Sequence, residues 1–145
     1  MTLPAPHPGL VVCYAYLWRD ERRRGRREGV KDRPCAIVLA AADEQGDTVV
    51  TVVPITHSPP AEAEDGVEIP EPTRKRLGLD DRPCWAVVSE VNRFVWPGPD
   101  LRPVSRRAPG RFDYGVLPPT LFKRIRDRLL RRAARQRLAR VRRGE

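Results

Sequence analysis

A chain of 145 residues suits one domain, and it can bury a hydrophobic core without the help of disulfides. Its net charge of +9 comes from residues 118–145, where eleven Lys and Arg face two acids, so that residues 1–117 are neutral overall. Such a basic end binds nucleic acid or an acidic protein. The sequence lacks the roughly 18 uninterrupted apolar residues of a membrane span and lacks a signal peptide, so we expect a cytoplasmic protein that does not enter a membrane.

Short apolar runs early in the chain predict a β-meander. Residues 9–18 are rich in β-formers and predict a first strand, and the charged residues 19–31 predict a mobile loop after it. Residues 35–42 and 48–55 predict two further strands, joined by a hairpin turn over residues 43–47. We expect these three strands to pair as antiparallel neighbours.

Gly and Pro punctuate the middle of the chain. Residues 67–69 predict a short edge strand, and residues 72–77 predict a helical turn that Gly78 ends. Residues 84–89 predict another strand, and residues 90–96 either continue it or form its neighbour. Many short strands of this kind favour a mainly β fold, as a small sandwich or barrel.

The last predicted element is a helix that Pro118 and Pro119 open, with Thr120 as a candidate N-cap, and that extends to about Arg142. One apolar stripe at helical spacing is expected to pack on the sheet. It consists of Leu121, Phe122, Ile125, Leu129 and Ala133. A second stripe either faces a partner or belongs to a solvated helix end. It consists of Leu130, Ala134, Leu138 and Val141.

The elements predict a simple organisation. The parts are an N-terminal arm (1–8), a barrel domain (9–99), a linker (100–117) and a basic C-terminal helix (118–145). Phe112 and Tyr114 are expected to hold the linker against the core. Cys13, Cys35 and Cys84 are odd in number and show no C-x-x-C spacing, so we expect buried free thiols in a reducing compartment. The two histidines complete no zinc ligand set, so no metal is predicted.

Three segments join a strand to polar residues at one of its ends, where side chains are held rigidly yet reach water. They are residues 31–39 (KDRPCAIVL), 52–58 (VVPITHS) and 87–92 (VVSEVN). Together with the Gly-led first strand and the charged loop, the Arg33-Pro34 and Pro54-Ile55-Thr56 motifs resemble the MazF/PemK family of toxin endoribonucleases. The order and spacing match over residues 9–96.

The resemblance implies a small SH3-like antiparallel barrel of the MazF/PemK/CcdB type, here with a basic C-terminal α-helix, and a homodimer. It also implies the toxin of a type II toxin–antitoxin system, with an acidic antitoxin as partner. The implied activity is cleavage of single-stranded RNA without metal or other cofactor. The ribose 2′-OH attacks its own phosphate, which requires a base, an acid and a cation to stabilise charge on phosphorus.

Four residues are candidates for this chemistry. Arg33 matches the family's catalytic Arg and can hold two phosphate oxygens, although it could instead pair with Asp32. Thr56 matches the family's catalytic Thr, although a strand-end Thr also bonds its own backbone. Glu90 lies near the acidic base of some members, which also carry an Arg where this chain has Val88. His57 is the other candidate base, because its unperturbed pKa suits proton transfer near neutrality.

Candidate RNA-binding residues are Lys31, Ser58, Arg93, Lys123 and Arg124. The basic helix that carries the last two could hold RNA through phosphate contacts or dock an acidic antitoxin. A second hypothesis is a non-catalytic barrel that binds RNA or inhibits a protein target such as DNA gyrase. The pair of Arg33 and Thr56 favours the first hypothesis, and the Val at position 88 favours the second.

Overall fold

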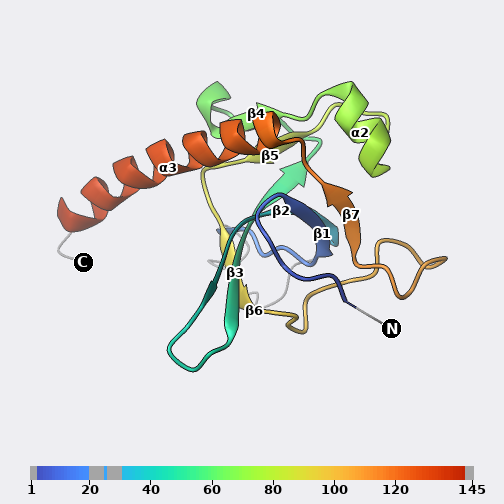
Figure 1. The fold of residues 1–145 in the computed structure, drawn as a ribbon. Helices are drawn as coiled ribbons and strands as arrows, with labels where there is room; N and C mark the ends of the chain where they lie inside the picture. The colour runs from blue at the N-terminus through green and yellow to red at the C-terminus, as the bar shows by residue number, and fades with distance from the viewer. Residues whose placement is uncertain (1–2, 20–24, 26–30, 143–145) are drawn as a thin grey trace.

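The part of the chain that the structure describes is mainly β, with seven antiparallel strands and a long C-terminal helix (Figure 1). This computed structural model describes residues 3–19, 25 and 31–142, of which residues 137–142 are described by backbone alone. The strands are β1 (Leu10–Tyr14), β2 (Arg33–Ala42), β3 (Thr48–Thr56), β4 (Gly66–Glu68), β5 (Trp85–Val87), β6 (Asn92–Val95) and β7 (Asp113–Val116). The helical segments are η1 (Ala63–Asp65), α2 (Glu71–Leu77) and α3 (Pro119–Arg142).

The strand order is β4-β5-β3-β2-β1-β7, and β6 also pairs with β3. No pairing joins β4 to β7 among the described residues, so the sheet is not closed. The mainly β prediction with a C-terminal helix is therefore confirmed. β5 pairs with the end of β3 at Ile55 and Thr56, whereas β6 pairs with residues 49–52 of the same strand. Residues 90–96 thus contain a separate strand rather than a continuation of β5.

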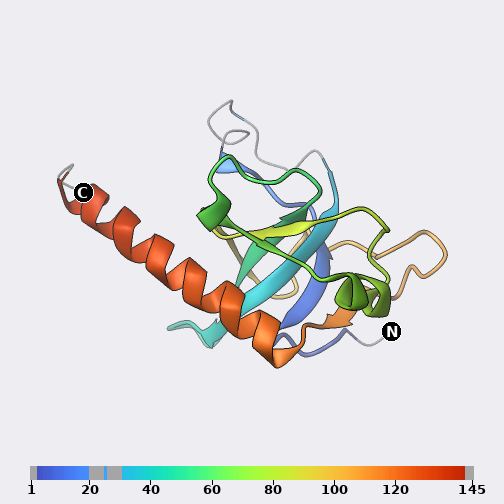
Figure 2. The ribbon, with the colours of Figure 1, turned by 90° about the horizontal axis from the view of Figure 1, so that it is seen from above.

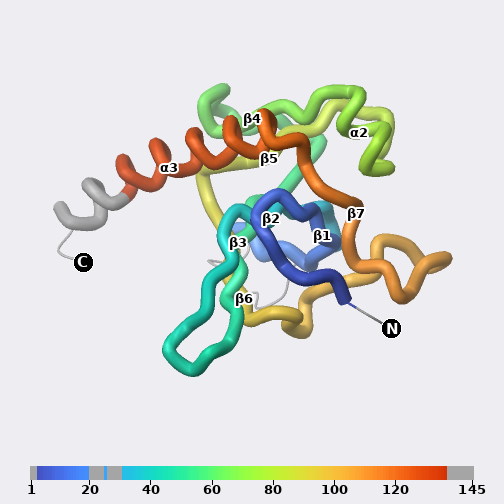
Figure 3. Tube along the Cα trace, viewed as in Figure 1, coloured from blue at the N-terminus to red at the C-terminus, as the bar shows by residue number. Residues whose placement is uncertain are grey.

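The β2–β3 hairpin brings the start of β2 and the end of β3 to one end of the sheet, and a β-bulge between Ile37 and Leu39 shifts its register. Its turn closes where the Asp43 N–H donates to the Asp47 carbonyl over 2.8 Å, and Gly46 takes a φ of +84°. This confirms the turn predicted over residues 43–47, which Figure 3 shows projecting at one end of the molecule. β2 begins at Arg33, two residues earlier than expected, so a functional candidate is the first residue of the strand.

The expected linker over residues 100–117 contains a strand, which corrects our division of the chain. β7 pairs with β1, with Leu10 opposite Val116. Residues 100–117 contain no long apolar run that would predict a strand. β7 pairs instead with the edge of β1, which lies far earlier in the sequence. Phe112 and Tyr114 pack against the core, as expected.

The sheet carries a buried core on both faces. One cluster joins β1, β2, β3 and β5 to α2 and α3, and Ile69 and Ile125 are fully buried in it. The other cluster contains several aromatic side chains, among which Tyr14 stacks on Phe94 at a centroid distance of 4.5 Å. The alternation of side chains along β2 and β3 supplies both clusters.

Helix α3 docks on the sheet by its first apolar stripe and then extends beyond it (Figure 2). Leu121 and Ile125 are buried, and Phe122 and Leu129 pack against the same cluster. Leu130, of the second stripe, is 57% exposed. Ala134 is also exposed, and the side chains of Leu138 and Val141 lie outside the described residues. The helix begins at Pro119, so Thr120 lies within its first turn instead of capping it.

Arginines of α3 also fasten the helix to η1 and β4. Arg132 Nε lies 3.0 Å from Asp65 Oδ1, and Arg128 donates to the Gly66 carbonyl over 2.8 Å. Part of the basic charge of this helix is therefore used within the fold. No described helix is both long and apolar enough to cross a bilayer.

The three cysteines are free and buried, as expected. Burial raises the pKa of the Cys84 thiol to about 11 and that of Cys35 well above its ordinary value. Because the thiolate is the reactive form, we expect a thiol reagent to modify the native protein at least about 10² times more slowly than the urea-unfolded chain. Rapid modification of all three thiols in the native protein, measured by mass spectrometry, would contradict this burial.

Candidate functional site

The site lies where β2 begins and β3 ends. The β2–β3 ladder ends at the pair of Cys35 and Pro54, beyond which Arg33 pairs with Tyr14 of β1 and Thr56 pairs with Trp85 of β5. Arg33 and Thr56 each lie two residues beyond that last pair, and both line one cleft. Two motifs that are more than 20 residues apart in sequence therefore meet at one end of the sheet.

A cleft of about 550 Å³ opens at this end of the sheet and is called the Arg33–Thr56 cleft below. It brings together five of the nine predicted site residues. These are Lys31, Arg33, Thr56, His57 and Ser58. Lys31 and Ser58 are exposed, whereas Arg33 and Thr56 are partly buried. A cleft with this lining presents cations and a hydroxyl to a ligand, a combination suited to a phosphate group.

Arg33 contacts an aromatic ring, and no acid among the described residues forms an ion pair with it. Its Cζ lies 5.1 Å from the ring centroid of Trp18, within range of a cation–π contact. The neighbouring Asp32 forms its ion pair with Arg102, at 3.7 Å. Arg33 Nε is buried and has no hydrogen-bond acceptor among the described residues. An oxygen of a bound phosphate would satisfy this donor.

Thr56 has its hydroxyl oxygen engaged as an acceptor. The Ser58 N–H donates to Thr56 Oγ1 over 3.2 Å, which closes a local turn at the strand end. A hydroxyl that accepts from an N–H still has its own proton to donate. The local role expected of a strand-end threonine and a donor role toward phosphate are therefore compatible.

His57 directs both ring nitrogens to acceptors. Nδ1 lies 2.9 Å from the Pro83 carbonyl oxygen, and Nε2 lies 2.9 Å from Asp80 Oδ2. Both ring nitrogens therefore lie within hydrogen-bond distance of an oxygen acceptor. A backbone hydrogen bond from Arg82, and then the charge of His57, lower the pKa of Asp80. In this arrangement His57 fastens the end of β3 to the loop before β5 and has no free nitrogen to act as a base.

The cleft also contains ionisable residues that sequence reasoning did not select. They are Asp32, Asp80, Arg82, Cys84 and Tyr114. Asp32 precedes Arg33 and could have been selected for that reason, because a carboxylate next to a phosphate-binding arginine is a candidate base. Tyr114 comes from β7, and no local signal places it here. Burial raises the pKa of Tyr114, so its phenol stays protonated.

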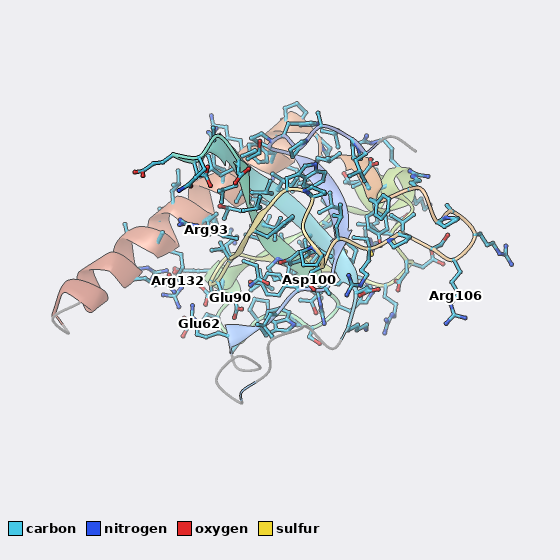
Figure 4. All side chains as sticks on the ribbon, turned by 90° about the horizontal axis from the view of Figure 1, so that it is seen from below. Glu62, Glu90, Arg93, Asp100, Arg106 and Arg132 are labelled. Carbon is cyan, nitrogen blue, oxygen red and sulfur yellow. The ribbon has the colours of Figure 1, made fainter. Side chains whose placement is uncertain are left out.

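The other four predicted site residues lie outside this cleft. Glu90 accepts from the backbone of Arg19, and Arg93 lines a separate groove of about 390 Å³. Lys123 and Arg124 are exposed on α3 and do not line the cleft. In Figure 4 Glu90 lies toward the α3 side, near Arg132, whereas Arg106 lies at the tip of a loop on the opposite side.

Comparison with known proteins adds no assignment. No protein-family model and no curated protein matches this chain. The functional argument therefore depends on the geometry of the Arg33–Thr56 cleft.

Proposed function

We propose that this protein is an endoribonuclease toxin of the MazF/PemK type, with an SH3-like barrel, that cleaves single-stranded RNA at the Arg33–Thr56 cleft. The observation that carries the proposal is that Arg33, from the start of β2, and Thr56, from the end of β3, line one cleft together with Lys31 and Ser58. The cleft suits one phosphate of an RNA strand, with a charged fork on one side and a hydroxyl donor on the other.

The proposed reaction is attack of the ribose 2′-OH on its own phosphate. The bond between the 2′-oxygen and phosphorus forms, the bond between phosphorus and the 5′-oxygen breaks, and solvent water protonates the leaving oxygen, which gives a 2′,3′-cyclic phosphate and a 5′-OH. Arg33 stabilises the extra negative charge on the phosphoryl oxygens in the transition state, and Thr56 donates one hydrogen bond to them. Asp32, half exposed at the cleft and paired only at 3.7 Å, is the carboxylate best placed to accept the 2′-OH proton. No step requires a metal ion.

The decisive test is incubation of the purified protein with long single-stranded RNAs in EDTA. We expect cleavage products with a 2′,3′-cyclic phosphate end, and we expect a 2′-deoxy ribose at the cleaved position to abolish the cut. If the folded protein cuts none of a varied panel of RNAs, the enzymatic proposal fails.

Replacing Thr56 tests the hydroxyl donor. Thr56→Val keeps the shape of the side chain but removes the hydroxyl, so we expect single-turnover cleavage to fall by about 10-fold or more. Thr56→Ser keeps the hydroxyl and should retain most of the rate. Equal rates for wild type and Thr56→Val, with unchanged thermal melts, would remove Thr56 from the mechanism.

The partners belong to the same proposal. A homodimer is expected from the family resemblance, and light scattering that shows a monomer with full cleavage activity would exclude it. An acidic antitoxin has an exposed basic surface available on α3, where Lys123, Arg124 and Arg131 face solvent. Charge-reducing variants at these three positions should weaken binding of an acidic partner most at low salt.

A non-catalytic RNA-binding barrel is the second candidate. The observation that favours it is that neither base expected from the sequence is available at the cleft. Both ring nitrogens of His57 face acceptors, and Glu90 lies outside the cleft. This alternative predicts RNA binding that falls with salt concentration and is lost in Arg33→Ala, without cleavage by wild type.

A further inference from the structure

The segment that follows β1 is held by side chains from the start of β6 and from the residues just before it. Asn92 Oδ1 accepts from the Leu17 N–H over 2.8 Å, and Asn92 Nδ2 donates to the Leu17 carbonyl over 2.9 Å. One amide side chain thus satisfies both backbone groups of one residue, as a neighbouring strand would. We call residues 16–19 the strap.

Glu90 holds the strap on either side of Leu17. Its Oε1 accepts from the Arg19 N–H over 2.9 Å and from the Tyr16 hydroxyl over 3.3 Å. The Arg19 guanidinium in turn donates to the Ser89 carbonyl over 3.1 Å. The carboxylate of Glu90 is therefore occupied by the strap, which explains why it does not face the cleft.

The strap places Trp18 under the Arg33 guanidinium. The Trp18 ring meets the ring of Tyr16 edge-on at a centroid distance of 5.2 Å, and Tyr16 is only 1% exposed. The guanidinium lies over the Trp18 ring at 5.1 Å. An aromatic face restrains the plane of a guanidinium but accepts none of its in-plane N–H bonds, which stay available for a ligand.

We propose that Trp18 is a positioning residue for Arg33 and that Glu90 and Asn92 act through it, a role that rests on the RNA-cleaving function proposed above. Trp18 sets the guanidinium plane so that Nε and a terminal nitrogen meet two oxygens of the scissile phosphate. Glu90 and Asn92 fix the strap that carries the ring. Glu90 is thus a positioning residue and not the general base.

A double-mutant cycle tests the role of Trp18. Trp18→Leu should slow single-turnover cleavage at saturating RNA by about 10-fold, the scale of a partly desolvated cation–π contact, whereas Trp18→Phe should stay within about threefold. In an Arg33→Ala background, Trp18→Leu should cause no further loss. Trp96→Leu is the matched control, because Trp96 packs on Phe94 in the same aromatic cluster, and it should leave the rate unchanged.

The same four proteins of the cycle are titrated with a 2′-O-methyl RNA, which binds without being cut. If wild type cleaves no RNA, the proposed function fails, and the cycle on binding still decides whether Trp18 acts through Arg33. The other outcome is that wild type cleaves RNA, but Trp18→Leu lowers the rate by the same factor with Arg33 present and in the Arg33→Ala background. That outcome would overturn the positioning role and leave the proposed function standing.

Variants of Glu90 separate positioning from base catalysis. Gln keeps an oxygen acceptor for the Arg19 N–H and the Tyr16 hydroxyl, so Glu90→Gln should retain cleavage within about threefold, whereas Glu90→Ala should lose about 10-fold. If Glu90 were the general base, Glu90→Gln would reduce the cleavage rate by about 10² or more and would abolish the acidic limb of the pH–rate profile. That second pattern would contradict the positioning role proposed for Glu90.

Discussion

Arg33→Ala should reduce single-turnover RNA cleavage by about 10² or more, the scale of losing one strong electrostatic donor in a transition state. Arg33 is the first residue of β2 and lines the same cleft as Thr56, with a buried Nε that has no acceptor among the described residues. The variant therefore removes a charged fork that the fold holds ready for a phosphate. Arg33→Lys should recover only part of the loss, because an ammonium cannot bind two oxygens in one plane.

The control for this experiment is Arg106→Ala. Arg106 is an exposed arginine at a loop tip (Figure 4) that does not line the cleft, and its removal lowers the net charge by the same amount. It should cleave as wild type does. Thermal melts check folding, since Arg33 also packs on Trp18. Wild-type cleavage by a folded Arg33→Ala protein would show that the active site lies elsewhere.

Ile125→Ala should lower the free energy of unfolding by about 2–5 kcal/mol, the cost of truncating a fully buried aliphatic side chain. Ile125 is 0% exposed and joins α3 to the cluster that contains Val11, Val53 and Ile69. The loss should show as a lower urea midpoint with little change in the m value.

Leu130→Ala is the matched control on the same helix. Leu130 is 57% exposed, and Leu and Ala have similar helix propensities, so the change should stay within about 0.5 kcal/mol. Equal destabilisation by the two variants would mean that the helix does not dock by its first stripe. Because Leu121 and Ile125 of α3 are buried in the core, we expect deletion of residues 120–145 to destabilise the fold, so single substitutions are the better test of RNA binding by the helix.

Local patterns were sufficient to predict much of this protein. Apolar runs over residues 35–42 and 48–55 place two strands, and the polar turn between them joins them as antiparallel neighbours. A hairpin brings the start of its first strand and the end of its second to the same end of the sheet, so the sequence predicts that Arg33 and Thr56 lie close together. The exact register was not predicted, because a β-bulge between Ile37 and Leu39 shifts it by one residue. The apolar spacing of Leu121, Ile125 and Leu129 likewise predicts the docking face of α3.

Contacts between distant segments were decided only by the tertiary structure. Glu90 follows a strand and has the sequence context of a site residue, yet its carboxylate meets the strap, more than 70 residues earlier in the chain. His57 is similarly occupied by Asp80 and Pro83 across a loop. Periodicity describes which face a side chain occupies but not which distant group meets it there, because that depends on how the strands and loops pack together. For the same reason the sequence did not predict β7, which forms by pairing with the edge of β1.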